Sequence, residues 1–112
     1  MSRSDILRGE IWWVSLDPTQ GAEIKKTRPC LVISHDTLNK LRKTVIVVPI
    51  SSAAKPHPPL TVSFTCQGKP TVAIIDQIRA VAKHRLKSRI ENASVDDIKA
   101  VEDGIATVLQ LP

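Results

Sequence analysis

The sequence predicts a mainly β fold with one α-helix at its C-terminal end. Through the first ninety residues, short runs of apolar and β-branched residues alternate with turns that contain proline or glycine. After Ser94, apolar residues recur every three or four positions, which is the period of an amphipathic helix. Because few segments remain for crossover helices, a small, strongly bent antiparallel sheet or barrel is favoured over a doubly wound domain.

The expected strands are rich in valine, isoleucine, threonine or aromatic residues. They span residues 10–16, 29–34, 44–50, 60–66, 71–78 and 86–90. The polar segment 19–27 is predicted to be a surface loop, and 35–43 has room for one helical turn. Segment 51–59 contains three prolines, which cannot donate to a ladder, so we expect an extended loop there.

The C-terminal helix has a clear start signal. Ser94 is a suitable N-cap, and the acidic side chains of Asp96 and Asp97 in the first turn suit the positive end of the helix dipole. Gly104 costs such a helix about 1 kcal/mol relative to alanine, so packing must offset that cost.

Length and composition indicate a single globular domain over residues 1–112. The apolar fraction of 42% and the charged fraction of 24% are typical of soluble globular proteins, so we expect a folded core and not a disordered chain. No apolar run reaches the roughly 20 residues that span a bilayer, and no signal-peptide core follows the N-terminus. Two cysteines, Cys30 and Cys66, cannot supply a disulfide framework or a four-ligand zinc site alone, so a reduced, cytoplasmic location is expected.

Charge divides the chain into a basic body and an acidic tail. Residues 1–89 hold fifteen basic and six acidic residues, a net charge of +9, whereas the last 23 residues have a net charge of −4. A basic body attracts polyanions by replacing their condensed counterions, so nucleic acid is the leading class of partner.

The common catalytic signatures are absent: there is no phosphate-binding glycine loop, no histidine pair at metal spacing and no nucleophile elbow. Cys30 is expected to be a small core residue within a strand. Trp12 and Trp13 must point to opposite faces, so one can enter the core while the other meets solvent, a subunit or a base.

One arginine and two pairs of polar residues stand where apolar runs begin or end. Arg28 begins a buried strand, Ser51 and Ser52 follow one, and Asp76 and Gln77 follow another. A guanidinium so placed can grip a phosphate with its planar fork of donors. Turn chemistry for the serines, and an ion pair with Arg79 for the aspartate, are the structural alternatives.

In these segments the chain resembles the MazF/PemK (Kid) family of toxins from bacterial toxin–antitoxin pairs. The resemblance is carried by RGEIWWVSLDPT at 8–19, Gly21 and Glu23, TRPCLV at 27–32, VVPISS at 47–52 and DQIR at 76–79. Occurrence of all these pieces in this order is far more specific than any one of them.

The resemblance implies an SH3-like small β-barrel of the CcdB/PemK/MazF type, a homodimer, and a metal-independent endoribonuclease without cofactors. Such enzymes cut single-stranded RNA at short motifs, and attack by the ribose 2′-hydroxyl gives a 2′,3′-cyclic phosphate and a 5′-hydroxyl. The family places an arginine and a hydroxyl residue at the scissile phosphate, which correspond to Arg28 and Ser51. An antitoxin of the MazE/PemI type, with an acidic C-terminal segment, is the implied protein partner.

Further residues are expected to position RNA or contact bases: Glu23, Lys25, Lys26, Ser52, Asp76, Gln77 and Arg79. Base choice is expected to depend on the loops at 21–26 and 52–60. Two departures from the Kid-like branch limit the transfer: Ala22 stands where that branch has a histidine, and Ile74 where it has an arginine. The match is therefore closer to the MazF-like arrangement, and the general acid and base stay unassigned.

Two other functions stay open at this stage. A DNA gyrase inhibitor of the CcdB type would share the fold and would use the acidic face of the C-terminal helix instead of Arg28. A non-catalytic nucleic-acid module is disfavoured because the chain has few aromatic residues for stacking.

Overall fold

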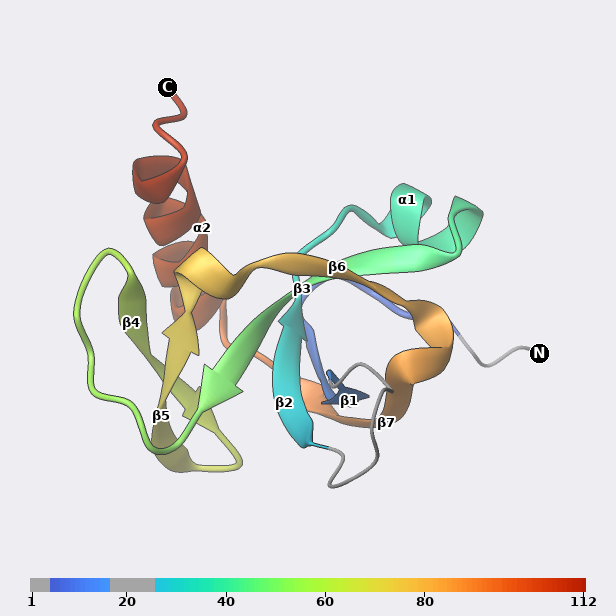
Figure 1. Ribbon diagram of the computed structural model, residues 1–112, viewed down its shortest axis with the longest axis horizontal. Coiled ribbons are helices and arrows are strands. Elements are labelled where there is room, and N and C mark those ends of the chain that lie inside the picture. Colours follow the sequence, from blue (N-terminus) through green and yellow to red (C-terminus); the bar gives the residue numbers. More distant parts are fainter. Residues whose placement is uncertain (1–4, 17–25) are drawn as a thin grey trace.

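The computed structural model describes residues 5–16 and 26–112, and Figure 1 shows their arrangement. The elements in chain order are β1 (Glu10–Ser15), β2 (Thr27–Val32), α1 (Asp36–Leu41), β3 (Thr44–Ser51), β4 (Thr61–Cys66), β5 (Lys69–Ile74), η1 (Ile75–Gln77), β6 (Arg79–Ala82), η2 (Lys83–Arg85), β7 (Leu86–Asn92) and α2 (Val95–Val108). The predicted mainly β fold with a C-terminal helix is confirmed. No helix in this part of the chain is long and apolar enough to cross a bilayer.

The strands form one antiparallel sheet in the order β4-β5-β3-β2-β1-β7, and β6 pairs with β3 outside that path. The central strand β3 changes partners along its length. Residues 44–47 pair with β6, residues 47–49 pair with β2, and Ile50 and Ser51 pair with β5. This change of partners along β3 bends the sheet strongly. Because β4 and β7 are the two ends of the strand order, the hydrogen-bonded sheet of the described residues is open.

The bend gives the sheet two hydrophobic clusters. One lies under α2 and includes Ile11, Leu31, Ile50 and Ile75. The other draws on the opposite faces of β1, β2 and β3 together with β6 and β7; it includes Cys30, with Trp12 packed against it. The alternation of strand side chains between two faces explains why neighbouring residues of β2 belong to different clusters.

One predicted strand is wrong in part. Segment 71–78 was expected to be a single strand, but β5 ends at Ile74, η1 forms a corner, and β6 begins at Arg79. Both β5 and β6 pair with β3, at its two ends, so the chain must turn between them. Ile75 at this corner is buried in the cluster under α2. A local apolar pattern carries no information about such a change of partner.

The helices agree with expectation. The helical turn predicted within 35–43 is α1, whose N-cap His35 accepts a hydrogen bond from the Thr37 N–H at 3.0 Å. Ser94 is confirmed as the N-cap of α2, and its hydroxyl oxygen accepts from the Asp97 N–H at 3.1 Å. The cap satisfies one of the donors that the first turn leaves unpaired.

Candidate functional site

A pocket of about 360 Å³ lies at the end of β3, and we call it the β3-end pocket. Strand β3 stops at Ser51, whereas its neighbours β2 and β5 continue past that point (Figure 1). The space between these two overhanging strands is the pocket. Its lining residues are Trp13, Thr27, Arg28, Pro29, Ile50, Ser52, Cys66, Gln67, Lys69 and Thr71.

Arg28, the second residue of β2, lines this pocket. It is half-buried and pairs with Val14 of β1. The ladder between β2 and β3 ends at Cys30 and Pro49. If the same register continued for two more residues, Arg28 would pair with Ser51. Instead, Ser51 pairs with Val72 of β5. Arg28 therefore lies where β3 has left β2 for β5, and it is one of the residues that line the pocket.

The two serines at this strand end have different surroundings. Ser51 is 7% exposed, its hydroxyl oxygen accepts from the Ala53 N–H at 3.1 Å, and it is not part of the pocket lining. Ser52 is exposed and lines the pocket together with Arg28. A hydroxyl that accepts one hydrogen bond keeps its own O–H for donation, so Ser51 can still donate to a ligand.

The positive charge of two arginines reaches the core side of β2. Burial raises the pKa of the Cys30 thiol to about 12, while the nearby guanidinium groups of Arg79 and Arg28 act in the opposite direction. The thiol is therefore protonated at neutral pH, and the prediction that Cys30 is a core residue is confirmed by its complete burial in the second cluster. Because both arginines act on one thiol, they bring positive charge to the same part of the sheet.

The remaining predicted residues lie away from the pocket lining. Asp76 and Gln77 are exposed on η1. Arg79 donates to the Leu16 carbonyl at 3.4 Å, and the Lys26 carbonyl accepts from the Leu16 N–H at 3.2 Å, so Arg79 and Lys26 converge on the end of β1. Glu23 and Lys25, together with Ala22, lie outside the described residues.

Several lining residues were not singled out from the sequence. Gln67 and Lys69 fall between the expected strands 60–66 and 71–78, and Thr71 begins the second of them; no local signal connects these residues with Arg28. Trp13 did have a signal, because one of two adjacent tryptophans had to leave the core. The structure assigns that role: Trp12 packs in the second cluster and donates its Nε1–H to Glu10 at 3.0 Å, while Trp13 lines the pocket.

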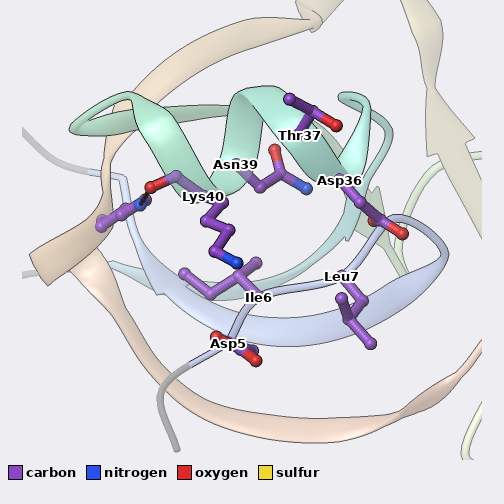
Figure 2. Close-up of a pocket in the computed structure, with 8 residues that line it drawn as sticks. Asp5, Ile6, Leu7, Asp36, Thr37, Asn39 and Lys40 are labelled. Carbon is purple, nitrogen blue, oxygen red and sulfur yellow. Dashed lines mark hydrogen bonds between the residues drawn. The ribbon is translucent and has the colours of Figure 1, made fainter. Parts of the chain in front are cut away.

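A second hollow lies at the other end of β2. Its volume is about 370 Å³. Figure 2 shows that it lies between the 5–7 segment and α1, with Lys40 extending toward Ile6. Its lining includes the carboxylates of Asp5 and Asp36 and the amines of Lys40 and Lys83. These opposite charges balance, so this hollow lacks the positive character that a phosphate requires.

Metal ligands do not gather in this part of the molecule. Within residues 5–16 and 26–112, no three histidine, cysteine, aspartate or glutamate side chains form a group able to hold a metal ion.

A small bent sheet that places an arginine, a lysine and hydroxyl groups around one hollow, on a strongly basic body, is typical of domains that act on nucleic acid. Residues 7–109 match the model of the PemK-like, MazF-like toxins of type II toxin–antitoxin systems, and the chain belongs to that family.

Two curated relatives carry names that describe an activity. The chain is 34% identical over 113 residues to the endoribonuclease MazF9 of Mycobacterium tuberculosis, covering 93% of this chain and 96% of the relative. It is also 34% identical over 112 residues to the endoribonuclease PemK of Escherichia coli, covering 96% of this chain and 84% of the relative.

Solved structures agree with the fold. A MazE–MazF crystal structure from Deinococcus radiodurans superposes with a TM-score of 0.83 at 24% identity, covering 96% of this chain and 98% of that one. An endoribonuclease in complex with its cognate antitoxin from a mycobacterial species has a TM-score of 0.79 at 20% identity, with 96% and 97% covered. At these identities the likeness concerns the fold.

Proposed function

We propose that this chain, a toxin of the endoribonuclease type, cleaves single-stranded RNA without a metal ion. Its main support is the position of Arg28 at the β3-end pocket, where Ser52 and Lys69 also line the hollow. The basic body supplies the attraction for a polyanion. Membership of the toxin family favours this function over the gyrase-inhibitor class.

The reaction needs three events at one phosphodiester. The ribose 2′-oxygen loses its proton and bonds to phosphorus, negative charge develops on the phosphorane oxygens, and the 5′-oxygen leaves with a proton. The bond between phosphorus and the 5′-oxygen breaks as the bond to the 2′-oxygen forms. The products are a 2′,3′-cyclic phosphate and a 5′-hydroxyl, and no water enters this step.

Arg28 stabilises the phosphorane charge in this scheme. A guanidinium presents five donors in a fixed plane and stays protonated in proteins, so it suits an electrostatic role better than that of a base. Ser51 donates its O–H to a phosphate oxygen, since its oxygen already accepts from Ala53. Ser52 is a second donor at the mouth of the pocket.

The other expected residues act on the RNA that flanks the cut. Lys26 and Arg79 are assigned to the RNA backbone on the β1 side, because both lie beside Leu16 at the end of β1. Asp76 and Gln77 on η1 lie away from the pocket lining, so their part is to position RNA further along the strand. Glu23 and Lys25 complete the proposed set from the segment between β1 and β2.

Incubation of the purified chain with a long single-stranded RNA in excess EDTA tests this proposal. Discrete fragments with 5′-hydroxyl and cyclic-phosphate ends are expected. An RNA that stays intact, or cleavage that disappears on chelation, contradicts the proposal. The Arg28→Lys variant serves as the inactive control, because it keeps the charge and loses the planar fork.

We also propose that a small antitoxin with an acidic segment covers the basic pocket, and that the toxin forms a homodimer. Occupation of the native state by such a partner would stabilise the toxin by mass action. Gel filtration with light scattering measures both assemblies. A mass of one chain at micromolar concentration contradicts the dimer, and an unchanged elution volume after addition of the neighbouring gene's product contradicts the antitoxin.

A further inference from the structure

We propose that the β3-end pocket binds one unpaired nucleobase next to the scissile phosphate, and that the turn between β4 and β5 determines which base is accepted. This inference rests on the proposed RNA-cleaving function and adds a specificity element to it. The turn lies outside the loops at 21–26 and 52–60 to which base choice was assigned from the sequence.

Trp13 forms the wall on which a base can stack. The chain has three aromatic residues. Phe64 is 2% exposed in the core, and Trp12 is packed and hydrogen-bonded to Glu10. Trp13 is half-buried and lines the pocket. Its neighbour on β2 is Pro29, with which it pairs in the β1–β2 ladder and which also lines the pocket. Single-stranded RNA is recognised mainly by stacking of splayed bases on aromatic faces, which makes Trp13 the available platform.

The opposite wall is a strained two-residue turn. Cys66 pairs with Lys69, and the two residues between them, Gln67 and Gly68, have φ values of 55° and 74°. Positive φ at both central positions is the requirement of a type I′ turn, which favours asparagine or glycine at the first of them. A glutamine at the first central position costs conformational free energy because its φ is positive, and the turn itself does not require a glutamine.

The surroundings hold this turn in place and leave the glutamine amide for a ligand. The Gln67 N–H donates to the Glu91 carboxylate at 2.7 Å, which anchors the turn to β7. Among the described residues, the Gln67 side-chain amide makes no hydrogen bond, although the residue lines the pocket. An amide presents a donor beside an acceptor, which matches the edge of an unpaired base.

Arg28 and Ser52 are assigned to the phosphate in the proposed reaction, and three further polar groups of the lining are poorly suited to distinguish bases. The Thr71 hydroxyl already donates to the Phe64 carbonyl at 3.0 Å. Burial and the charge of Glu91 raise the pKa of the Cys66 thiol, so it stays protonated and is a weak donor. Lys69 offers charge without directional pairing and suits a phosphate. The Gln67 amide is therefore the group that can discriminate between bases.

Cut-site mapping on a randomised single-stranded RNA pool tests this role. Gln67→Gly keeps a residue that accepts positive φ and removes the amide, and Gln67→Leu keeps the bulk. Both variants should lower the base preference at one position adjoining the cut by at least about tenfold. Gln110→Gly is the matched control, because Gln110 is the other glutamine at positive φ, 56°, and lies beyond α2. It should leave the cut pattern unchanged.

A binding measurement separates this inference from the proposed function. Oligonucleotides with a 2′-deoxy sugar at the attacking nucleotide cannot be cleaved, and four of them differ only in the adjoining base. Tryptophan fluorescence of the wild-type chain should be quenched with a clear base preference. Trp13→Leu should lose the quench and bind at least about fivefold more weakly.

The outcomes are distinct. A wild-type chain that cleaves no RNA but shows base-dependent quenching would refute the ribonuclease proposal and support the base subsite. Cleavage with an unaltered cut pattern in both Gln67 variants would leave the ribonuclease standing and overturn the subsite. If Trp13→Leu fails to fold, the Gln67 variants decide the matter, since the turn tolerates glycine.

Discussion

Gly104 of α2 packs directly against Ile75 of η1. A Cβ atom at Gly104 would lie 3.1 Å from the Ile75 Cγ1 atom and 3.4 Å from the Pro59 carbonyl oxygen. Ile75 is 1% exposed in the main hydrophobic cluster, so it has little room to move. The glycine that is unfavourable for an isolated helix is therefore what lets α2 approach the corner between β5 and β6.

Gly104→Ala is expected to destabilise the protein in spite of the better helix propensity of alanine. Propensity alone would add about 1 kcal/mol to the free energy of unfolding. Overpacking against Ile75 costs about 1–3 kcal/mol, so we expect a net loss of about 1 kcal/mol in urea unfolding. An alanine variant more stable than the wild type would show that η1 can yield to the added methyl group.

Arg28→Lys is expected to slow RNA cleavage by at least about 100-fold, the scale of removing one donor from a developing charge. The substitution retains the positive charge and loses the bidentate geometry. Cleavage rates at saturating RNA give the comparison. Arg42→Lys, at an exposed position after α1, is the control and should cleave at the wild-type rate. Equal rates for the two variants would remove Arg28 from the reaction.

Alkaline pH should destabilise the fold through Cys30. Burial raises the pKa of this thiol from 9.0 to about 12. Between these values the unfolded chain releases the proton and the native chain keeps it. The free energy of unfolding therefore falls as pH rises above 9, by up to about 1.4 kcal/mol per pH unit. Below pH 9 both states hold the proton and the contribution is flat.

The contribution of Cys30 is isolated by comparison with Cys30→Ala. That variant has a lower stability at neutral pH because a buried group is lost, and its stability should fall less steeply above pH 9. Urea unfolding at several pH values measures both slopes. Parallel slopes in the two proteins would mean that the native thiol ionises as readily as an exposed one.

Glu10→Ala is expected to lower the free energy of unfolding by about 2–3 kcal/mol. Glu10 is 8% exposed, and its carboxylate accepts from the Leu7 N–H at 2.9 Å, the Trp12 Nε1–H at 3.0 Å and the Arg89 Nε–H at 3.1 Å. Removing it leaves three part-buried donors without this acceptor. Thermal unfolding followed by tryptophan fluorescence measures the effect.

The matched control for Glu10 is Glu102→Ala. Glu102 also forms an ion pair, with Arg8, but both side chains of that pair are more than a third exposed. Solvent-exposed pairs contribute little, so this variant should unfold within about 0.5 kcal/mol of the wild type. Similar losses for Glu10 and Glu102 would contradict the special role of the buried carboxylate.

Much of the fold could be predicted because its signals are local. Apolar and β-branched runs predicted most of the strands, Ser94 marked the start of α2, and the setting of Cys30 within an apolar run placed it in the core. The exception is informative: segment 71–78 was expected to be one strand, yet β5 ends within it at Ile74, η1 forms a corner, and a second strand follows at Arg79. Pairing with a distant strand decides that division, and no window of sequence contains it.

The residues of the candidate site likewise fall into those that the sequence identifies and those that only the structure identifies. Arg28 and the serine pair were recognisable because each stands at the end of an apolar run and matches a family motif. Gln67 and Lys69 have no such mark, since their importance depends on lying across a hollow from Trp13. Residues far apart in the chain acquire a shared role only when strands bring them together.

The amino-acid sequence by itself determined the strand-rich class, the capped terminal helix, the basic body and the toxin family. Only the tertiary structure decided that β3 ends short of its neighbours and leaves a pocket between Arg28 and the β4–β5 turn. The reason is physical: periodicity and capping are set by residues within a few positions of each other, whereas a pocket is set by where separate strands stop.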